Sequence, residues 1–233
     1  MPGCDMAIPY PCYTRGADAP PADPRRRQSP RPAGGGPHVN YLAHLWLTEQ
    51  AGLPLPGAIL GDLVHGRLDG RYGAALERSI ALHRRVDAVT DAHPLVASAR
   101  AGYGPGARRY AGIVLDLLHD HALALDWSAF STEPLEAFAD RAAHALAAEQ
   151  QGFALAGKQA PPREEFRRLL LSYALPEGMD RAVRRVASWM RKPEGLIDAA
   201  RDWRERLPAA RQRLPPLLED LRSASQAFAA GGG

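Results

Sequence analysis

Aspartate and histidine side chains interrupt an apolar stretch near the middle of the chain, VLDLLHDHALALDW, residues 114–127. Asp116 and Asp120 are four residues apart, so in a helix they project from one face. Two carboxylates that face a protein interior repel each other unless a cation or a proton lies between them. The stretch therefore predicts a cation site, to which the neighbouring His121 adds an imidazole.

A second stretch, LHRRVDAVTD, repeats this pattern, because its histidine and aspartates follow one another at four-residue steps. Two further apolar stretches each contribute one side chain of ligand type. Imidazole and carboxylate without thiolate suit Mn²⁺, Fe²⁺ or Zn²⁺ with open positions for water and substrate. Such a metal lowers the pKa of water and polarises a phosphoryl oxygen. The residues added to the predicted site are His44, Asp62, His83, Asp87 and Asp91.

Each of these residues also has an ordinary structural interpretation. His44 alone fits a hydrogen-bonded core histidine, and His83 with Asp87 fits a surface pair worth a few tenths of a kcal/mol. Asp116 and Asp120 could pair with arginines such as Arg84 or Arg108. Four separate segments that each supply a ligand type on an apolar helix favour the metal site. The histidines interpreted as structural or surface residues are His38, His65, His93, His119 and His144.

A stability expectation follows from the predicted carboxylate pair. If Asp120 crowds an anionic site, Asp120→Ala removes repulsion in the metal-free protein. The variant is then expected to lose hydrolysis and yet to leave the domain folded.

Helical periodicity dominates the chain, and strand signals are nearly absent. The sequence predicts a single all-α domain of seven to nine helices without internal repeats. The C-terminal part is expected to form two helices broken at Pro208 or Pro215. The first four expected helices cover residues 40–50, 55–66, 79–93 and 107–127. Asn40 is the expected N-cap of the first, and Ser79 that of the third, which should end before Pro94.

Residues 1–39 differ from the rest of the chain, because they are dense in proline, glycine and arginine and lack an apolar period. They are expected to be disordered. A valine codon can start translation in bacteria, so Val39 is one candidate for the authentic start, and residues 1–38 would then be a mis-called leader. A basic nucleic-acid-binding arm at Arg25–Arg27 is the functional alternative, although we expect no nucleic-acid partner.

Composition sets further bounds on the class of protein. Both cysteines, Cys4 and Cys12, lie in the first dozen residues, so neither a disulfide framework nor a cysteine metal site is expected. No uninterrupted apolar run of about 18 residues exists, and no secretory signal is evident. We therefore expect a cytoplasmic protein without membrane insertion.

Charge divides unevenly along the chain. Residues 40–160 carry 10 Lys and Arg against 13 Asp and Glu, whereas residues 161–233 carry 14 against 10. This asymmetry would suit a cation in the first half and an acidic partner that docks on the second. The ordinary alternative is a set of surface arginines on solvated helices.

Four ordered motifs resemble the bacterial acyl carrier protein phosphodiesterase family over about residues 40–210. They are NYLAHLWL at 40–47, GAILGDLVHG at 57–66, LHRRVDAVTDAHP at 82–94 and LDLLHDHALALDW at 115–127. The resemblance implies a divergent, all-helical HD-type phosphohydrolase that uses a divalent cation, usually Mn²⁺. It also implies removal of 4′-phosphopantetheine from holo acyl carrier protein to give apo carrier protein.

The family's acidic and histidine positions fall on Asn40, His44, Asp62, His83, Asp87, Asp91, Asp116, Asp120 and His121. In typical HD enzymes the doublet reads His-Asp, whereas here Asp120-His121 is reversed, which leaves the assignment of each ligand open. The expected metal ligands are His44, Asp62, His83, Asp116 and Asp120. The expected catalytic residues are His121, as ligand or proton donor, Asp87, and Arg84 or Arg85 at the phosphate.

Two other function classes remain open at this stage. One is an HD-type hydrolase of a small phosphorylated metabolite or nucleotide, and the other is a non-catalytic helical protein that binds carrier protein. The carrier proteins of this family's reaction are strongly acidic, so a basic docking face is expected on the C-terminal helices. Its candidates are Arg163, Arg167, Arg168, Arg181, Arg184 and Arg185.

Overall fold

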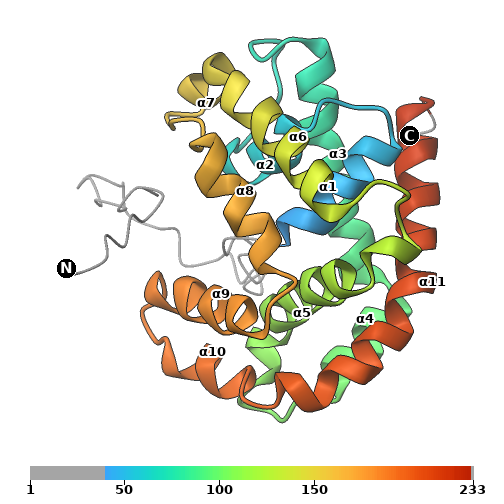
Figure 1. Ribbon diagram of the computed structural model, residues 1–233, viewed down its shortest axis with the longest axis vertical. Coiled ribbons are helices and arrows are strands. Elements are labelled where there is room, and N and C mark those ends of the chain that lie inside the picture. Colours follow the sequence, from blue (N-terminus) through green and yellow to red (C-terminus); the bar gives the residue numbers. More distant parts are fainter. Residues whose placement is uncertain (1–39, 232–233) are drawn as a thin grey trace, which may run out of the picture. The chain divides into compact units, whose positions relative to one another are not determined.

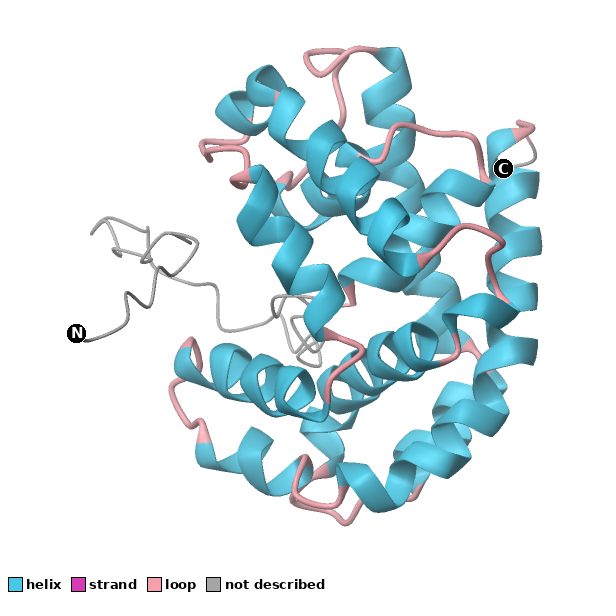
Figure 2. Cartoon of the chain, in the orientation of Figure 1, coloured by secondary structure: helices cyan, strands magenta, loops and turns pink. Residues whose placement is uncertain are grey.

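Helices make up the architecture of residues 40–231, the part of the computed structural model that is described (Figure 1). This part contains no strand, which confirms the all-α prediction (Figure 2). The helices are α1 Tyr41–Gln50, α2 Pro56–Leu63, α3 Ala74–Ala92, α4 Pro94–Ala101, α5 Ala111–Leu125, α6 Leu135–Ala148, α7 Gln150–Leu155, α8 Arg163–Ser172, α9 Pro176–Ser188, α10 Glu194–Ala199 and α11 Trp203–Ala229. Two 3-10 turns, η1 Arg108–Tyr110 and η2 Trp127–Ala129, flank α5.

The described part has eleven α-helices, so the prediction of seven to nine was too low. The two unexpected helices, α4 and α7, are short. Pro94 occupies the first helical position of α4, where its fixed φ angle favours a helix start. The side chain of Glu149 accepts a hydrogen bond from the backbone N–H of Gly152 and caps α7.

Residues 1–39 and 232–233 lie outside the described part. The expected disorder of residues 1–39 and the candidate start at Val39 therefore stay predictions. Among residues 40–231, no helix combines the length and the apolar character that crossing a bilayer requires.

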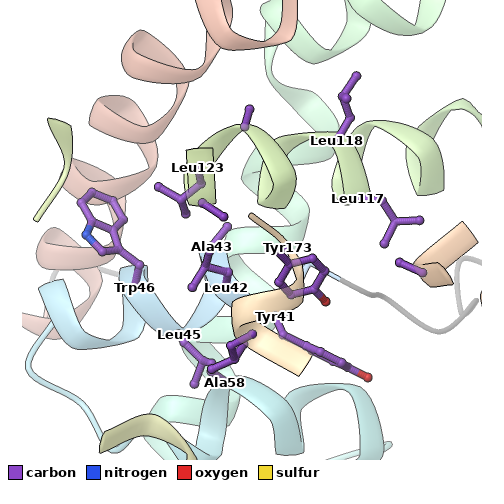
Figure 3. Packing of buried hydrophobic residues seen from close by; sticks show 14 of the residues in the cluster. Tyr41, Leu42, Ala43, Leu45, Trp46, Ala58, Leu117, Leu118, Leu123 and Tyr173 are labelled. Carbon is purple, nitrogen blue, oxygen red and sulfur yellow. The ribbon is translucent and has the colours of Figure 1, made fainter. Parts of the chain in front are cut away.

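The first helix, α1, lies at the centre of the packing. Eight consecutive residues, 41–48, are buried, so α1 is covered on all sides rather than on one stripe. It packs against α2, α3, α5 and α11. Figure 3 shows Leu42 and Ala43 of α1 near Leu123 of α5. This burial places His44, in the middle of α1, inside the domain.

The third helix, α3, begins earlier than predicted. Ser79 was expected to cap it, but the helix starts at Ala74 after Gly73, whose φ angle of 79° ends the preceding loop. Ser79 is buried inside α3, where its Oγ donates a hydrogen bond of 2.7 Å to the carbonyl of Pro54. The end of α3 at Ala92, before Pro94, confirms the predicted end.

The C-terminal segment forms one helix of 27 residues, and the predicted break at Pro208 or Pro215 was wrong. The break comes earlier, between α10 and α11. The prolines within α11 lie on its exposed side, where water can satisfy the carbonyls that lose an N–H partner. The buried stripe continues past them at helical spacing, through Ala210, Leu214, Leu217, Leu218, Leu221 and Ser225.

Candidate metal centre

Three helices bring two imidazoles and two carboxylates together. Nε2 of His44, on α1, lies 3.1 Å from Oδ1 of Asp87, on α3. Nε2 of His83, which is also on α3, lies 3.3 Å from Oδ2 of Asp87. Nε2 of His83 also lies 3.2 Å from Oδ1 of Asp62, on α2. The two imidazole rings stack with centroids 4.1 Å apart. We call these four residues the His/Asp cluster.

The cluster is open to solvent on its carboxylate side. His44 and His83 are only 3% and 2% exposed, whereas the side chains of Asp62 and Asp87 are 13% and 22% exposed. A ligand can therefore approach through the carboxylates, while the imidazoles are fixed by the surrounding packing.

Two glycines on α2 allow this helix to approach α3 closely. A Cβ atom at Gly57 would lie 2.2 Å from Cβ of Ser79, and one at Gly61 would lie 2.2 Å from Cγ of His83. Gly57 and Gly61 are four residues apart, so they form one flat strip along α2. The close approach sets Asp62, the next residue along the chain, beside the imidazole of His83.

Gly61→Ala is expected to destabilise the protein by about 1–3 kcal/mol, since the added methyl group forces α2 away from α3. Divalent-cation affinity should fall as well, because Asp62 moves with α2. Gly106→Ala is the matched control, because a Cβ there meets no atom within 4 Å. Urea unfolding and Mn²⁺ titration measure both effects; equal affinity in the two variants would show that the α2–α3 approach does not position Asp62.

The carboxylates hold His83 in its protonated form when no cation is present. Burial alone would lower the pKa of His83, but Asp62 and Asp87 outweigh it and raise this pKa to about 10. Burial likewise disfavours the Asp87 carboxylate, yet the close imidazoles of His44 and His83 take its pKa well below the ordinary value. Burial and the nearby charge of His83 lower the pKa of His44, which stays neutral.

These two shifts predict that the joint contribution of His83 and Asp87 to the stability of the metal-free protein is complete between about pH 4 and pH 6.5. The raised pKa of His83 contributes stability that is complete below its unfolded value and is lost as the pH rises toward 10. The lowered pKa of Asp87 contributes stability that is complete above its unfolded value and is lost as the pH falls below it. Urea unfolding in a chelating buffer measures the profile. His83→Gln should flatten its alkaline side, and an unchanged alkaline slope in this variant would contradict the assignment.

A divalent cation fits the His/Asp cluster. Ligand atoms of His44, His83 and Asp87 all lie within 4.8 Å of one another. Both ring nitrogens of His44 are buried without a hydrogen bond of normal geometry, although Nε2 is close to Asp87. A buried imidazole nitrogen without a hydrogen bond is costly unless another ligand satisfies it. Nitrogen and carboxylate donors are those that Mn²⁺, Fe²⁺ and Zn²⁺ accept.

The structure therefore brings together four of the residues singled out from the sequence, with one change of role. Asp87 was predicted to be a catalytic residue, yet its carboxylate belongs to the group of potential ligands. The strip of glycines that sets the α2–α3 distance was not predicted, and its only sequence signal is the four-residue spacing of Gly57 and Gly61.

Asp116 and Asp120, the other two predicted ligands, do not join this group among the described residues. Asp120 is fully buried, and its two carboxylate oxygens accept hydrogen bonds from the backbone N–H groups of Leu42 at 2.9 Å and Ala43 at 2.8 Å. It thus caps the N-terminus of α1. Asp116 is half-buried, and its charge adds to burial in raising the pKa of Asp120.

Asn40 occupies the N-cap position of α1, as predicted, but its side chain makes no capping hydrogen bond. The capping oxygens come instead from Asp120, 78 residues away from Leu42 in sequence. Asp91, the third residue of the four-residue series, is exposed and forms an ion pair with Arg100.

His121 lies apart from the cluster ligands in the described structure, on α5. Its Nδ1 donates to the carbonyl of Tyr173, and its ring makes a T-shaped contact with that of Trp203. This hydrogen bond leaves Nε2 as the acceptor nitrogen. Burial lowers the pKa of His121, so its neutral ring is better suited to accept a proton or bind a cation than to donate a proton.

The two predicted phosphate contacts differ in their surroundings. The guanidinium of Arg84 donates to the backbone carbonyls of Val64 at 2.6 Å and Gly66 at 2.8 Å, which fixes the loop after α2. Arg85 is exposed on α3. It is two positions from His83 and two from Asp87, so it lies on the side of α3 opposite the His/Asp cluster.

The described residues define a class of protein: an all-helical protein with a two-histidine, two-aspartate cluster suited to a divalent cation. A family model for acyl carrier protein phosphodiesterase matches residues 39–221. The chain belongs to this family.

Proteins named acyl carrier protein phosphodiesterase are similar to the chain. That of Photorhabdus laumondii is 45% identical over 89 residues, or 38% of this chain and 45% of the relative. That of Klebsiella pneumoniae is 41% identical over 101 residues, or 43% of this chain and 52% of the relative. In these two, the match spans about half the relative's length. That of Enterobacter sp. strain 638 is 35% identical over 176 residues, or 72% of this chain and 86% of the relative. No solved structure matches.

Proposed function

We propose that this protein is a divalent-cation-dependent phosphodiesterase that hydrolyses the 4′-phosphopantetheine group from holo acyl carrier protein to give the apo form. Membership of the acyl carrier protein phosphodiesterase family supports the substrate. The observation that carries the chemistry is the convergence of His44, His83 and Asp87 within 4.8 Å.

His44, Asp62, His83 and Asp87 would hold the cation, for which we propose Mn²⁺. When bound, a cation of this kind lowers the pKa of water toward neutrality and polarises a phosphoryl oxygen. His83 must release its proton as it becomes a ligand, so cation affinity should rise with pH up to about its metal-free pKa of 10. Arg84 or Arg85 would neutralise phosphate charge; Arg84, three residues before Asp87, lies on the same side of α3 as that carboxylate.

A basic surface on α9 supports a protein substrate of acidic character. Arg181, Arg184 and Arg185 form no ion pair with any described residue, although the charge of Arg184 helps to lower the pKa of Asp180. Arg163 and Arg167, on α8, are paired with Asp140 and are weaker candidates. Arg168 contacts the backbone carbonyl of Glu164.

The direct test incubates the full chain with holo acyl carrier protein and Mn²⁺ and then measures the carrier by mass spectrometry. We expect loss of the prosthetic-group mass, and no loss after chelation. An unchanged carrier mass with Mn²⁺, Fe²⁺ and Zn²⁺ would refute the proposed reaction.

Charge reversal separates this proposal from hydrolysis of a small phosphorylated compound. Replacing Arg181, Arg184 and Arg185 with glutamate should raise KM for carrier protein and spare a small chromogenic phosphodiester, because only the protein substrate needs the α9 surface. The matched control reverses three arginines in surface ion pairs elsewhere, Arg71, Arg201 and Arg222. Equal losses on both substrates, or equal effects of both triples, would exclude docking on α9.

A further inference from the structure

A second group of polar side chains lies between the end of α4 and the long helix α11. Tyr103 follows α4, and the guanidinium carbon of Arg206, on α11, lies 4.1 Å from the centre of its ring. An N–H of Arg206 also makes a long, 3.5 Å hydrogen bond to the carbonyl of Gly102. Arg213 is seven residues further along α11 and therefore on the same side of that helix. We call Tyr103, Arg206 and Arg213 the Tyr103 site.

Each member of the Tyr103 site has a buried polar atom without a hydrogen-bond partner: Oη of Tyr103, Nε of Arg206 and Nε of Arg213. Tyr103 is only 3% exposed. All three groups can donate, and a guanidinium cannot accept. An unsatisfied buried donor is unfavourable, so three together indicate that the site lacks an acceptor.

The missing acceptor should also carry negative charge. Neither Arg206 nor Arg213 forms an ion pair with a residue of the described part. Burial lowers the pKa of Arg213; Tyr103 opposes this shift and the like charge of Arg206 adds to it. Burial raises the pKa of Tyr103 against the opposing charges of Arg206 and Arg213, and Asp202 adds to the rise. Asp202 makes no ion pair with either arginine.

His119, on α5, adds no positive charge to this region. Burial and the charge of Arg213 lower the pKa of His119 to about 4, so its imidazole is neutral near pH 7. Neither the phenol of Tyr103 nor the imidazole of His119 therefore offers a negative charge to the two guanidiniums.

We propose that the Tyr103 site binds a phosphate-type oxyanion, either inorganic phosphate or the phosphate group of a phosphomonoester. A tetrahedral dianion supplies several acceptor oxygens to the donors of Tyr103, Arg206 and Arg213, and it also neutralises the charge of both arginines. Water can accept hydrogen bonds from these donors but cannot neutralise the charge. The site shares no residue with the His/Asp cluster, which is built from α1, α2 and α3. It is thus a separate anion site, independent of the proposed hydrolysis.

Binding is tested on the metal-free full chain, so that neither a bound cation nor turnover contributes. Inorganic phosphate, glycerol phosphate and acetate are titrated at constant ionic strength against chloride, with melting temperature and calorimetric Kd as the measurements. We expect a saturable rise of the melting temperature with phosphate or glycerol phosphate and none with acetate. The tighter of the two phosphates identifies the class of natural ligand. The absence of any specific response would show that water alone occupies the site.

Variants locate the binding. Arg206→Gln with Arg213→Gln should weaken phosphate binding by roughly tenfold or more, because charge-assisted hydrogen bonds are lost. Arg201→Gln with Arg222→Gln removes the same charge from two exposed ion pairs and should leave Kd unchanged. An equal Kd in the wild type and both double variants would overturn the proposal.

Tyr103→Phe keeps the test informative if the double variant folds poorly. Because Oη of Tyr103 has no partner, its removal should not lower the melting temperature without phosphate. It should nevertheless weaken phosphate binding. Unchanged phosphate affinity in Tyr103→Phe would contradict the proposed role of this hydroxyl group.

Discussion

Asp87→Asn is expected to lower the turnover of holo carrier protein more than about a hundredfold, which exceeds the loss typical of a residue that only orients a ligand. Asp87 is the residue that both imidazoles of the cluster contact, through separate carboxylate oxygens. The amide retains its size and one acceptor oxygen but loses the negative charge that offsets a cation. Mn²⁺ affinity should fall together with activity, and mass spectrometry of the carrier with Mn²⁺ titration measures both.

The control for this prediction is Asp198→Asn, which removes a carboxylate from an exposed ion pair with Arg201 on the surface of the domain. This variant should keep its turnover and its Mn²⁺ affinity. If Asp87→Asn kept wild-type affinity for Mn²⁺ yet lost turnover, Asp87 would act on the substrate, as first predicted from the sequence, and not as a ligand. If it kept both, the His/Asp cluster would not be the active site.

The sequence alone located most of the cluster because helical spacing is a local property. The four-residue step between His83 and Asp87 places both side chains on one face of α3 wherever that helix packs. The apolar surroundings of His44 likewise indicated that its imidazole is buried. The distances across helices depend instead on how closely α2 approaches α3, which Gly57 and Gly61 determine through tertiary packing.

Four-residue spacing alone does not distinguish a carboxylate that could bind a cation from one that caps a helix. Asp116 and Asp120 have the spacing of His83 and Asp87, so the sequence predicted ligands in both places. The partner of Asp120 is the N-terminus of α1, which is brought to α5 only by the fold. A capping residue that lies far away in the sequence leaves no local signal, whereas Asn40, at the expected position, makes no capping hydrogen bond.

The prolines of α11 show a similar limit. Each removes a backbone donor, and the local rule predicted a break. The leucines on the opposite, buried side pack against α5, α3 and α1, and this tertiary packing maintains one continuous helix. The competition between a local penalty and long-range burial is decided only in the folded domain.

Asp120→Ala is expected to destabilise the metal-free protein by about 2–4 kcal/mol, which reverses the expectation drawn from the sequence. The substitution leaves the backbone N–H groups of Leu42 and Ala43 buried without acceptors. Burial and the charge of Asp116 raise the pKa of Asp120, so relief of this unfavourable burial offsets part of the loss.

The damage should extend to the cation site, because Asp120 holds the first turn of α1 and His44 lies at the end of that turn. Urea unfolding in a chelating buffer measures the stability, with Asp126→Ala as the control on the same segment. Asp126 forms a surface ion pair with Arg211, so its removal should cost less than about 1 kcal/mol. Equal stability of metal-free Asp120→Ala and wild type, with turnover abolished, would mean that Asp120 acts in the reaction and not as the cap of α1.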